Sequence, residues 1–259
     1  MSRPPARGGA PARRYAPPVE PNRPAPFVLP RPPEWRLGSN TPWLAPGVTV
    51  PAHLTTNGVA ATLEAGGFTA STQSRPPVAE WPGVPELEAA ATAAVLICLF
   101  DDDDGECRVL FERRAPDLRR HRDEVVFPGG FVEAGESAIE AALRETREEL
   151  GIPAGDVTVV GRLTPLRTYS GQIVIEPVVG ALRSRPVLSV EPAEVAYAFD
   201  VALAALLADG AFHEELWRRE GNPDAFAIYV FEVDGETIWG ATARILAELC
   251  SVLTGVARR

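Results

Sequence analysis

The sequence predicts an α/β fold over residues 88–256, in which helices cover both faces of a β-sheet. Two observations support this prediction. From about residue 88, short apolar runs typical of strands are mixed with three amphipathic stretches typical of helices. Prolines are concentrated before this point, with 18 of the 26 in residues 1–90. Strands and helices mixed around one core imply a sheet that is buried on both sides.

The segment before the domain divides into two parts. Residues 1–35 are rich in Pro and Arg and lack apolar periodicity, so they bury too little surface to offset chain entropy. We expect them to be a disordered arm. Residues 36–87 contain Trp43 and an apolar run over 53–63, and they are expected to be either a linker or an extension partly packed on the domain.

The expected strands and helices follow from the apolar pattern. Residues 90–100 are expected to form a buried strand that returns over 107–114. The Asp run between them favours a solvated hairpin tip over a metal site, because Asp and Gly favour turns. The remaining expected elements are strands at 157–166, 172–182 and 225–233, helices at 138–150 and 242–256, and a short strand or turn entering a helix within 192–209.

Composition excludes several classes of function. All 25 basic residues are Arg, so a mechanism that needs a Lys nucleophile or Schiff base is excluded. The net charge of −10 argues against nucleic-acid binding, which needs a basic face. The longest apolar run is too short to span a bilayer, and the three cysteines are expected to be buried free thiols. We expect a cytoplasmic protein without membrane contact, and its oligomeric state is left open, a homodimer included.

The helix at 138–150 has clear start and stop signals. Ser137 and Glu140 form a capping box, which gives Glu140 a structural role. Gly151 follows the last turn, where a left-handed residue is expected.

Three further glutamates crowd the C-terminal end of this helix, namely Glu145, Glu148 and Glu149. They repel one another and oppose the helix dipole, at a total cost of about 1–3 kcal/mol. A solvated charged face is the simplest interpretation. However, the glutamates converge on one turn beside Gly129 and Gly130, which allow close backbone approach to a ligand. Because Mg²⁺ bridges carboxylates to substrate phosphates, a metal site is the favoured interpretation.

The spacing of these residues resembles the Nudix box, GX5EX7REUXEEXGU, in which U is a bulky apolar residue. Gly130, Glu136 and the run from Arg144 to Ile152 fit it, with Thr146 at a U position as the only departure. The resemblance implies a Nudix hydrolase with an α/β/α sandwich and a mixed β-sheet. Such an enzyme cleaves a nucleoside diphosphate linked to another moiety, with Mg²⁺ or Mn²⁺ as cofactor.

The resemblance also assigns roles by position. A backbone carbonyl of Gly129 or Gly130 would assist the metal, and Glu136 and Arg144 would brace the loop against the helix. The metal ligands would be Glu145, Glu148 and Glu149. Glu145 is a candidate general base, and Glu191 or Glu194 in a later loop is another.

The segment before the box points to the substrate. Five Arg and His121 lie within residues 113–122, and Arg side chains recognise phosphate. The alternative is a solvated basic loop. The candidate substrate-binding residues are Arg113, Arg114, Arg119, Gly129 and Gly130.

This segment resembles the coenzyme A pyrophosphatase branch of the family, LLTxRSxxxRxxxGxxxFPGG. Leu110, Arg114, Arg119 and the run at 127–130 match the pattern. The departures are Phe111, Glu112 and Ala115 in place of Leu, Thr and Ser, and Asp123 in place of Gly. The resemblance implies hydrolysis of coenzyme A (CoA) or acyl-CoA to 3′,5′-ADP and phosphopantetheine or its acyl form.

Two other functions compete with this one. A Nudix pyrophosphatase could instead act on ADP-ribose, a dinucleotide or an oxidised nucleotide. A metabolite-sensing module with the same fold would bind without hydrolysis, but such a module is expected to lose box glutamates, and this sequence retains all of them.

Overall fold

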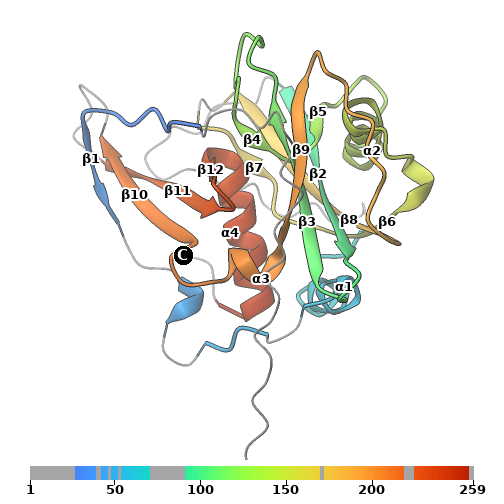
Figure 1. Cartoon of the computed structure of the whole chain (residues 1–259), viewed down its shortest axis with the longest axis horizontal. Helices are drawn as coiled ribbons and strands as arrows, with labels where there is room; N and C mark the ends of the chain where they lie inside the picture. Colours follow the sequence, from blue (N-terminus) through green and yellow to red (C-terminus); the bar gives the residue numbers. More distant parts are fainter. Residues whose placement is uncertain are drawn as a thin grey trace, which may run out of the picture.

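The computed structural model describes residues 27–38, 42–45, 48–51, 54–70, 91–169, 172–218 and 225–256. Within these residues the chain forms two β-sheets and four α-helices, and α4 lies between the two sheets (Figure 1). Most of the expected disordered arm, residues 1–26, lies outside the described residues. In the described part of the chain, no helix is long and apolar enough to cross a membrane.

The larger sheet is mixed, as expected, because β2 runs parallel to β8 and antiparallel to β3. Its central order is β4-β3-β2-β8-β6, while β5 pairs with β2, β7 with β8 and β9 with β3. The strands are β2 (Ala91–Asp101), β3 (Cys107–Arg114), β4 (Val125–Val126), β5 (Gly129–Phe131), β6 (Val157–Arg162), β7 (Leu166–Arg167), β8 (Ile173–Leu182) and β9 (Val195–Ala202).

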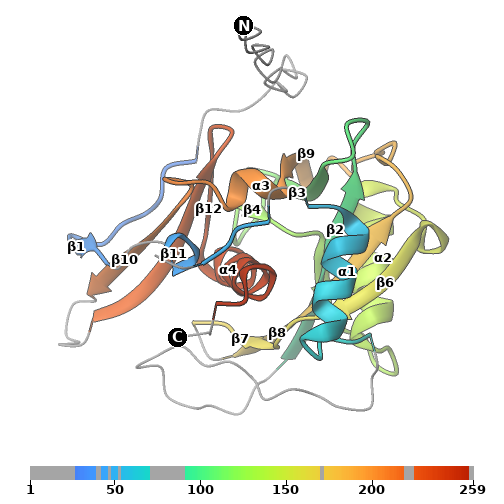
Figure 2. The same cartoon turned by 90° about the horizontal axis from the view of Figure 1, so that it is seen from below.

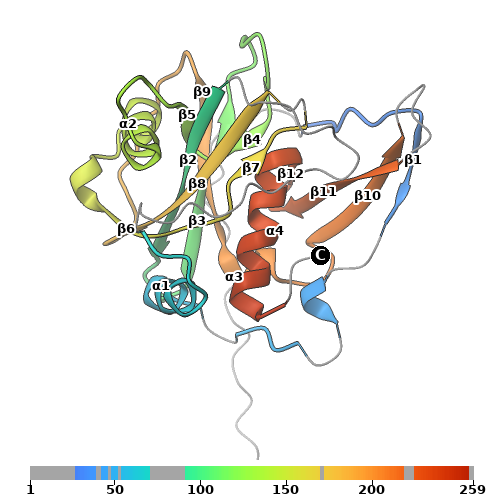
Figure 3. The ribbon, with the colours of Figure 1, turned by 180° about the vertical axis from the view of Figure 1, so that it is seen from behind.

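Helices cover both faces of this sheet, which confirms the predicted α/β/α sandwich. Helix α2 (Ala138–Leu150) lies on one face, and α1 (Thr56–Ala65) and α4 (Gly240–Thr254) lie on the other (Figures 2 and 3). Successive side chains of β2 point to opposite faces of the sheet, and helices cover both faces, so β2 is buried on both sides. Leu96 packs in the core beneath α2, whereas Ile97 packs in the core shared with α1 and α4.

Helix α2 begins and ends where the sequence predicts. Ser137 accepts a hydrogen bond from the Glu140 amide, and the Glu140 carboxylate accepts one from the Ser137 amide, so the capping box is formed. Gly151 has a φ of 73°, and its amide donates to the carbonyl of Arg147. These two ends fix the rotation of the helix and therefore the direction of each glutamate along it.

A second, four-stranded sheet was not predicted. Its order is β1-β10-β11-β12, and it packs against the side of α4 away from the larger sheet (Figure 2). The apolar run at 225–233 predicts β11 correctly, but β10 carries the buried Glu215 among its core residues, and β12 is only four residues long. The strands are β1 (Glu34–Leu37), β10 (Phe212–Arg218), β11 (Ala225–Val233) and β12 (Glu236–Trp239).

Two other elements differ from the expectation. The segment at 192–209 is mainly strand β9, and its helix α3 spans only Leu203–Leu206. The strand expected at 157–166 divides into β6 and β7 around Pro165, which has no N–H to donate to a neighbouring strand.

The described part of the extension, within residues 36–70, packs against the rest of the structure. Trp43 is 1 % exposed and lies against Phe212 and Phe231 of the second sheet. Helix α1 buries Leu63 completely. The structure also differs from the expected boundary at residue 35, because β1 crosses that position and pairs with β10.

Candidate active site

The glutamates near the end of α2 point in two directions. Glu149 is 2 % exposed and lies against the larger sheet, while the side chain of Glu148 is 49 % exposed. Glu145 precedes Glu149 by one helical turn, so the two share a face of the helix. The spacing along the helix therefore predicts that Glu145 and Glu149 share a face, but it does not predict that Glu149 is buried while Glu148 is exposed.

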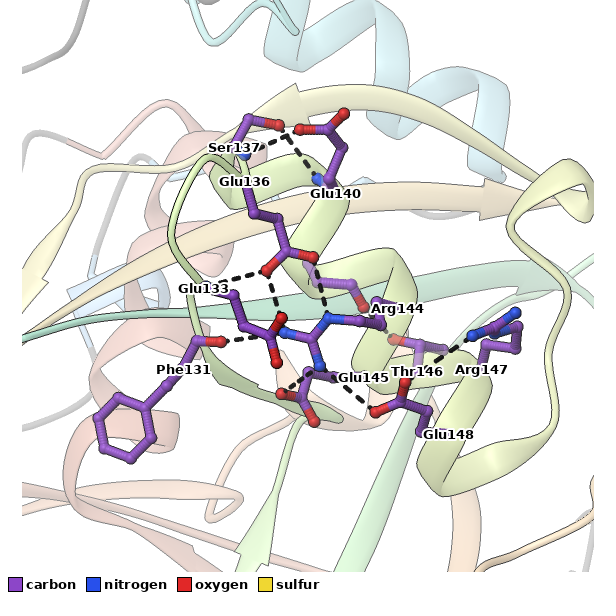
Figure 4. A network of polar contacts seen from close by, with 11 residues as sticks. Phe131, Glu133, Glu136, Ser137, Glu140, Arg144, Glu145, Thr146, Arg147 and Glu148 are labelled. Atoms are coloured by element: carbon purple, nitrogen blue, oxygen red, sulfur yellow. Dashed lines mark hydrogen bonds and ion pairs between the residues drawn. The ribbon is translucent and has the colours of Figure 1, made fainter.

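Arg144 connects two of these glutamates, Glu145 and Glu148, to the loop before the helix (Figure 4). Its guanidinium donates two hydrogen bonds to Glu136, of 2.9 and 3.0 Å, and one of 3.1 Å to the carbonyl of Phe131. It also contacts Glu145 at 2.9 Å and Glu148 at 3.3 Å. These contacts hold the pKa of Glu136 below its usual range. They are the geometry expected of a brace between loop and helix.

The two glycines of the loop let the backbone approach the carboxylates. The amide of Gly129 donates to Glu149 at 2.8 Å. A side chain at position 129 would collide with the β2 backbone at Ala94 and Val95, and one at Gly130 would collide with the Glu145 carboxylate. Gly129 therefore cannot be replaced without moving the β2 backbone, whereas a side chain at position 130 would displace the Glu145 carboxylate.

A fourth carboxylate, Glu112, lies close to this group and is completely buried. Among the described residues, neither of its oxygens has a hydrogen-bond partner. Burial raises the pKa of Glu112 well above its ordinary value, and the charge of Glu149 raises it further. Burial also raises the pKa of Glu149 to about 8, against the lowering effect of the Gly129 amide.

The chemistry of these carboxylates suits a hard divalent cation. Among the described residues, no three His, Cys, Asp or Glu side chains converge as a metal-binding group. Arg144 contacts Glu145 and Glu148 in this arrangement, so both must turn from it to bind an ion. The unpartnered oxygens of Glu112 and the raised pKa of Glu149 both indicate that positive charge is lacking here. An all-oxygen donor set fits Mg²⁺-like ions.

A cavity of about 850 Å³ opens beside the carboxylates, between the larger sheet, the N-terminal end of α4 and the second sheet. Arg114, Arg120 and His121 line one part of it. Aromatic side chains line another part, namely Tyr169, Trp217, Phe226 and Trp239. The cavity therefore combines a cationic region with an apolar region large enough for a ring or a chain.

The predicted substrate-binding arginines occupy three different environments. Arg114 lines the cavity, 4.0 Å from the Glu149 carboxylate. Arg113, its neighbour on β3, points to the opposite face, where it is buried and ion-paired with Glu236 at 3.3 Å. Arg119 is exposed and is not among the residues that line the cavity.

Two lining residues, Arg120 and His121, belong to the basic segment but were not among the candidate substrate-binding residues named from the sequence. A hydrogen bond with Glu124 raises the pKa of His121. Because side chains alternate along a strand, the sequence could have predicted that Arg113 and Arg114 point to opposite faces. The loop that contains Arg120 and His121 has no such periodicity.

Asp123, at the Gly position of the branch pattern, lies in a left-handed turn. Its φ is 60°, a left-handed conformation that Asp adopts more readily than most residues. Its carboxylate lies 3.6 Å from Arg113. The added negative charge is therefore close to a buried cation.

Comparison with known proteins shows the family. The NUDIX domain family matches residues 90–179. A protein named Uncharacterized Nudix hydrolase NudL, from Photorhabdus laumondii subsp. laumondii, is 38 % identical over 142 residues, which cover 54 % of this chain and 74 % of that protein. A protein of the same name from Yersinia pestis is 37 % identical over 162 residues, covering 61 % and 77 %. The chain belongs to the Nudix hydrolase family.

It is therefore an enzyme that hydrolyses a pyrophosphate bond, in a family that generally uses divalent metal ions. Among solved structures, a MutT/nudix family protein from Enterococcus faecalis is similar with a TM-score of 0.43 and 18 % identity, covering 64 % of this chain and 62 % of that one. The Nudix hydrolase RenU from M. smegmatis has a TM-score of 0.41 and 20 % identity, covering 49 % and 80 %.

The raised pKa of Glu149 predicts a pH dependence of stability in metal-free protein. A carboxyl with a pKa near 4.5 when unfolded and about 8 when folded stabilises the fold fully below pH 4.5. This contribution is lost as the pH rises to about 8, with a slope of up to about 1.4 kcal/mol per pH unit. We expect Glu149→Gln to flatten the curve in this window, measured by urea unfolding with chelator present. Parallel curves for the two proteins would contradict the prediction.

Proposed function

We propose that this Nudix hydrolase cleaves the pyrophosphate bond of CoA or acyl-CoA with Mg²⁺ or Mn²⁺. The products would be 3′,5′-ADP and 4′-phosphopantetheine or its acyl form. The observation that supports this best is the cavity, because it joins a cationic region beside the carboxylates to an aromatic region. CoA carries an additional phosphate at one end and an acyl-bearing thiol at the other, so it presents matching chemistry to both.

Each region of the proposed site has a separate task. Arg114 lies between the cavity and Glu149, and it would hold a pyrophosphate oxygen beside the carboxylates. Glu136 and Arg144 would keep the loop at 129–131 fixed against α2. When bound, the divalent cation would neutralise pyrophosphate charge and make the attacking water more acidic. The apolar walls would exclude other water from the reacting phosphorus.

A carboxylate must accept the proton of the attacking water, and two are the preferred candidates for this role. Glu145 faces the Gly130 backbone directly. Glu194 lies in the loop before β9, and its charge raises the pKa of both Glu112 and Glu149, which places it close to them. Its carbonyl is fixed at 2.8 Å by the amide of Ala115. Glu191, the other candidate in this loop, is not among the charges that raise the pKa of Glu112 and Glu149. Glu194 is therefore the preferred candidate of the two.

A dinucleotide or ADP-ribose is the second candidate substrate. The cavity walls include the stacked pair Trp217 and Trp239, with ring centres 5.8 Å apart, and the pair Tyr169 and Phe226, 4.4 Å apart. Flat aromatic surfaces also bind nucleobases by stacking. The extra phosphate and the apolar chain of acyl-CoA distinguish the two proposals experimentally.

A substrate panel tests the proposed function. The intact protein is assayed with CoA, acyl-CoA, ADP-ribose, NADH, diadenosine polyphosphates and 8-oxo-dGTP, each with Mg²⁺ or Mn²⁺. We expect the highest kcat/KM for CoA or acyl-CoA. Glu149→Gln should lower kcat by roughly a hundredfold or more, which is about 3 kcal/mol of transition-state stabilisation.

The matched control is Glu64→Gln, which makes the same chemical change on an exposed position of α1, across the sheet from α2. It should retain full activity. A preference for ADP-ribose or NADH over CoA would contradict the CoA proposal, and turnover of none of these compounds would contradict the proposed function as a whole.

The cationic region makes a second prediction. Arg120→Ala should raise the KM for CoA by about tenfold, because one charge-assisted hydrogen bond to the additional phosphate is lost. ADP-ribose lacks that phosphate, so its KM should change little. Arg119→Ala removes the same charge from an exposed neighbour outside the cavity lining and serves as the control. Equal changes in the two variants would exclude Arg120 from recognition of this phosphate.

A further inference from the structure

Glu112 occupies an unusual position for an acidic residue. Side chains along β3 alternate between faces, so Leu110 and Glu112 point toward α2 while Phe111 points toward α4. Leu110 is part of the core beneath α2, and Ala198, which faces Glu112 on the neighbouring strand β9, packs against the same core. Glu112 therefore projects into the interface between the larger sheet and α2, the interface in which Glu149 is buried.

The surroundings of Glu112 leave its charge uncompensated. The side chain is 0 % exposed, and within the part of the chain that the structure describes both carboxylate oxygens lack a hydrogen-bond partner. A buried ionised carboxylate without a partner is strongly unfavourable. The charged groups that act on it are Glu149, Glu194 and Glu145, with Arg114 as the opposing cation. Arg114 also lies 4.0 Å from Glu149, so one guanidinium is shared between two buried carboxylates.

Hydrogen bonds from the described residues do not compensate the negative charge buried at Glu112 and Glu149. Glu149 receives the Gly129 amide on one oxygen, and its other oxygen has the distant Arg114 contact. Glu112 receives neither. A divalent cation between the two carboxylates would supply the missing positive charge and would give the unpartnered oxygens a ligand role.

We propose that Glu112 is a ligand of the divalent metal ion, in addition to the glutamates of the Nudix box. It would form the buried end of the site with Glu149, while Glu145 and Glu148 would close it from the solvent side after leaving Arg144. The branch pattern has Thr at this position, so this chain brings one more carboxylate to the metal than the box alone provides. The inference rests on the proposed metal-dependent function.

The test measures metal binding without turnover. Mn²⁺ is titrated into the full chain and into Glu112→Gln, and free Mn²⁺ is followed by electron paramagnetic resonance. Loss of a ligand should weaken Mn²⁺ binding by about tenfold or more, as even changes to groups that only orient ligands cost 10- to 100-fold. Glu64→Gln, exposed on α1, should bind like the unaltered chain.

Thermal unfolding separates a ligand role from a role in folding. In chelator, Glu112→Gln should unfold at the same or a higher temperature, because it removes a buried unpaired acid. The rise in Tm that Mn²⁺ causes should be smaller than in the unaltered chain. If Glu112→Gln does not fold, Glu112→Thr is measured in the same way, since the branch pattern has Thr there.

Two results would overturn the inference in distinguishable ways. Unchanged Mn²⁺ affinity in Glu112→Gln, with weakened affinity in Glu149→Gln, would overturn the role of Glu112 and leave the proposed hydrolase intact. No Mn²⁺ binding to the unaltered chain, together with no turnover with either metal, would overturn both.

Discussion

The burial of negative charge between α2 and the larger sheet is the constraint that organises this molecule. Glu112 and Glu149 lie there beside a single nearby guanidinium, that of Arg114. A buried carboxylate pair with too little positive charge destabilises a fold. A divalent cation bound between the two carboxylates, as proposed above, would relieve this imbalance.

The rest of the fold holds this interface in place. The capping box and Gly151 set the two ends of α2, and Gly129 and Gly130 allow its carboxylates to reach the backbone of β5. Arg144 joins the loop to the helix and is ion-paired with the more exposed carboxylates, Glu145 and Glu148. The second sheet and α4 lie on the other side of the larger sheet from α2, and they form the far wall of the cavity.

The sequence predicts much of the framework because local signals are strong there. Strand 107–114, helix 138–150 and strand 225–233 have the predicted bounds, since apolar runs, a capping box and a C-terminal glycine act locally. The second sheet could not be predicted, because β10 buries Glu215, which depends on contacts distant in the sequence, including two hydrogen bonds from the Arg31 Nε. Glu112 is visible in the sequence only as a departure from a pattern, and its burial follows from packing beneath α2.

Anomalous diffraction from crystals of the full chain grown with Mn²⁺ would test the central claim most directly. The account predicts an anomalous peak between α2 and the loop at 129–131, within bonding distance of carboxylate oxygens from both the box and Glu112. Arg144 would then have lost its contacts with Glu145 and Glu148 while keeping Glu136. A peak bound by none of these carboxylates, or one confined to the Asp residues of the hairpin at 101–104, would contradict it.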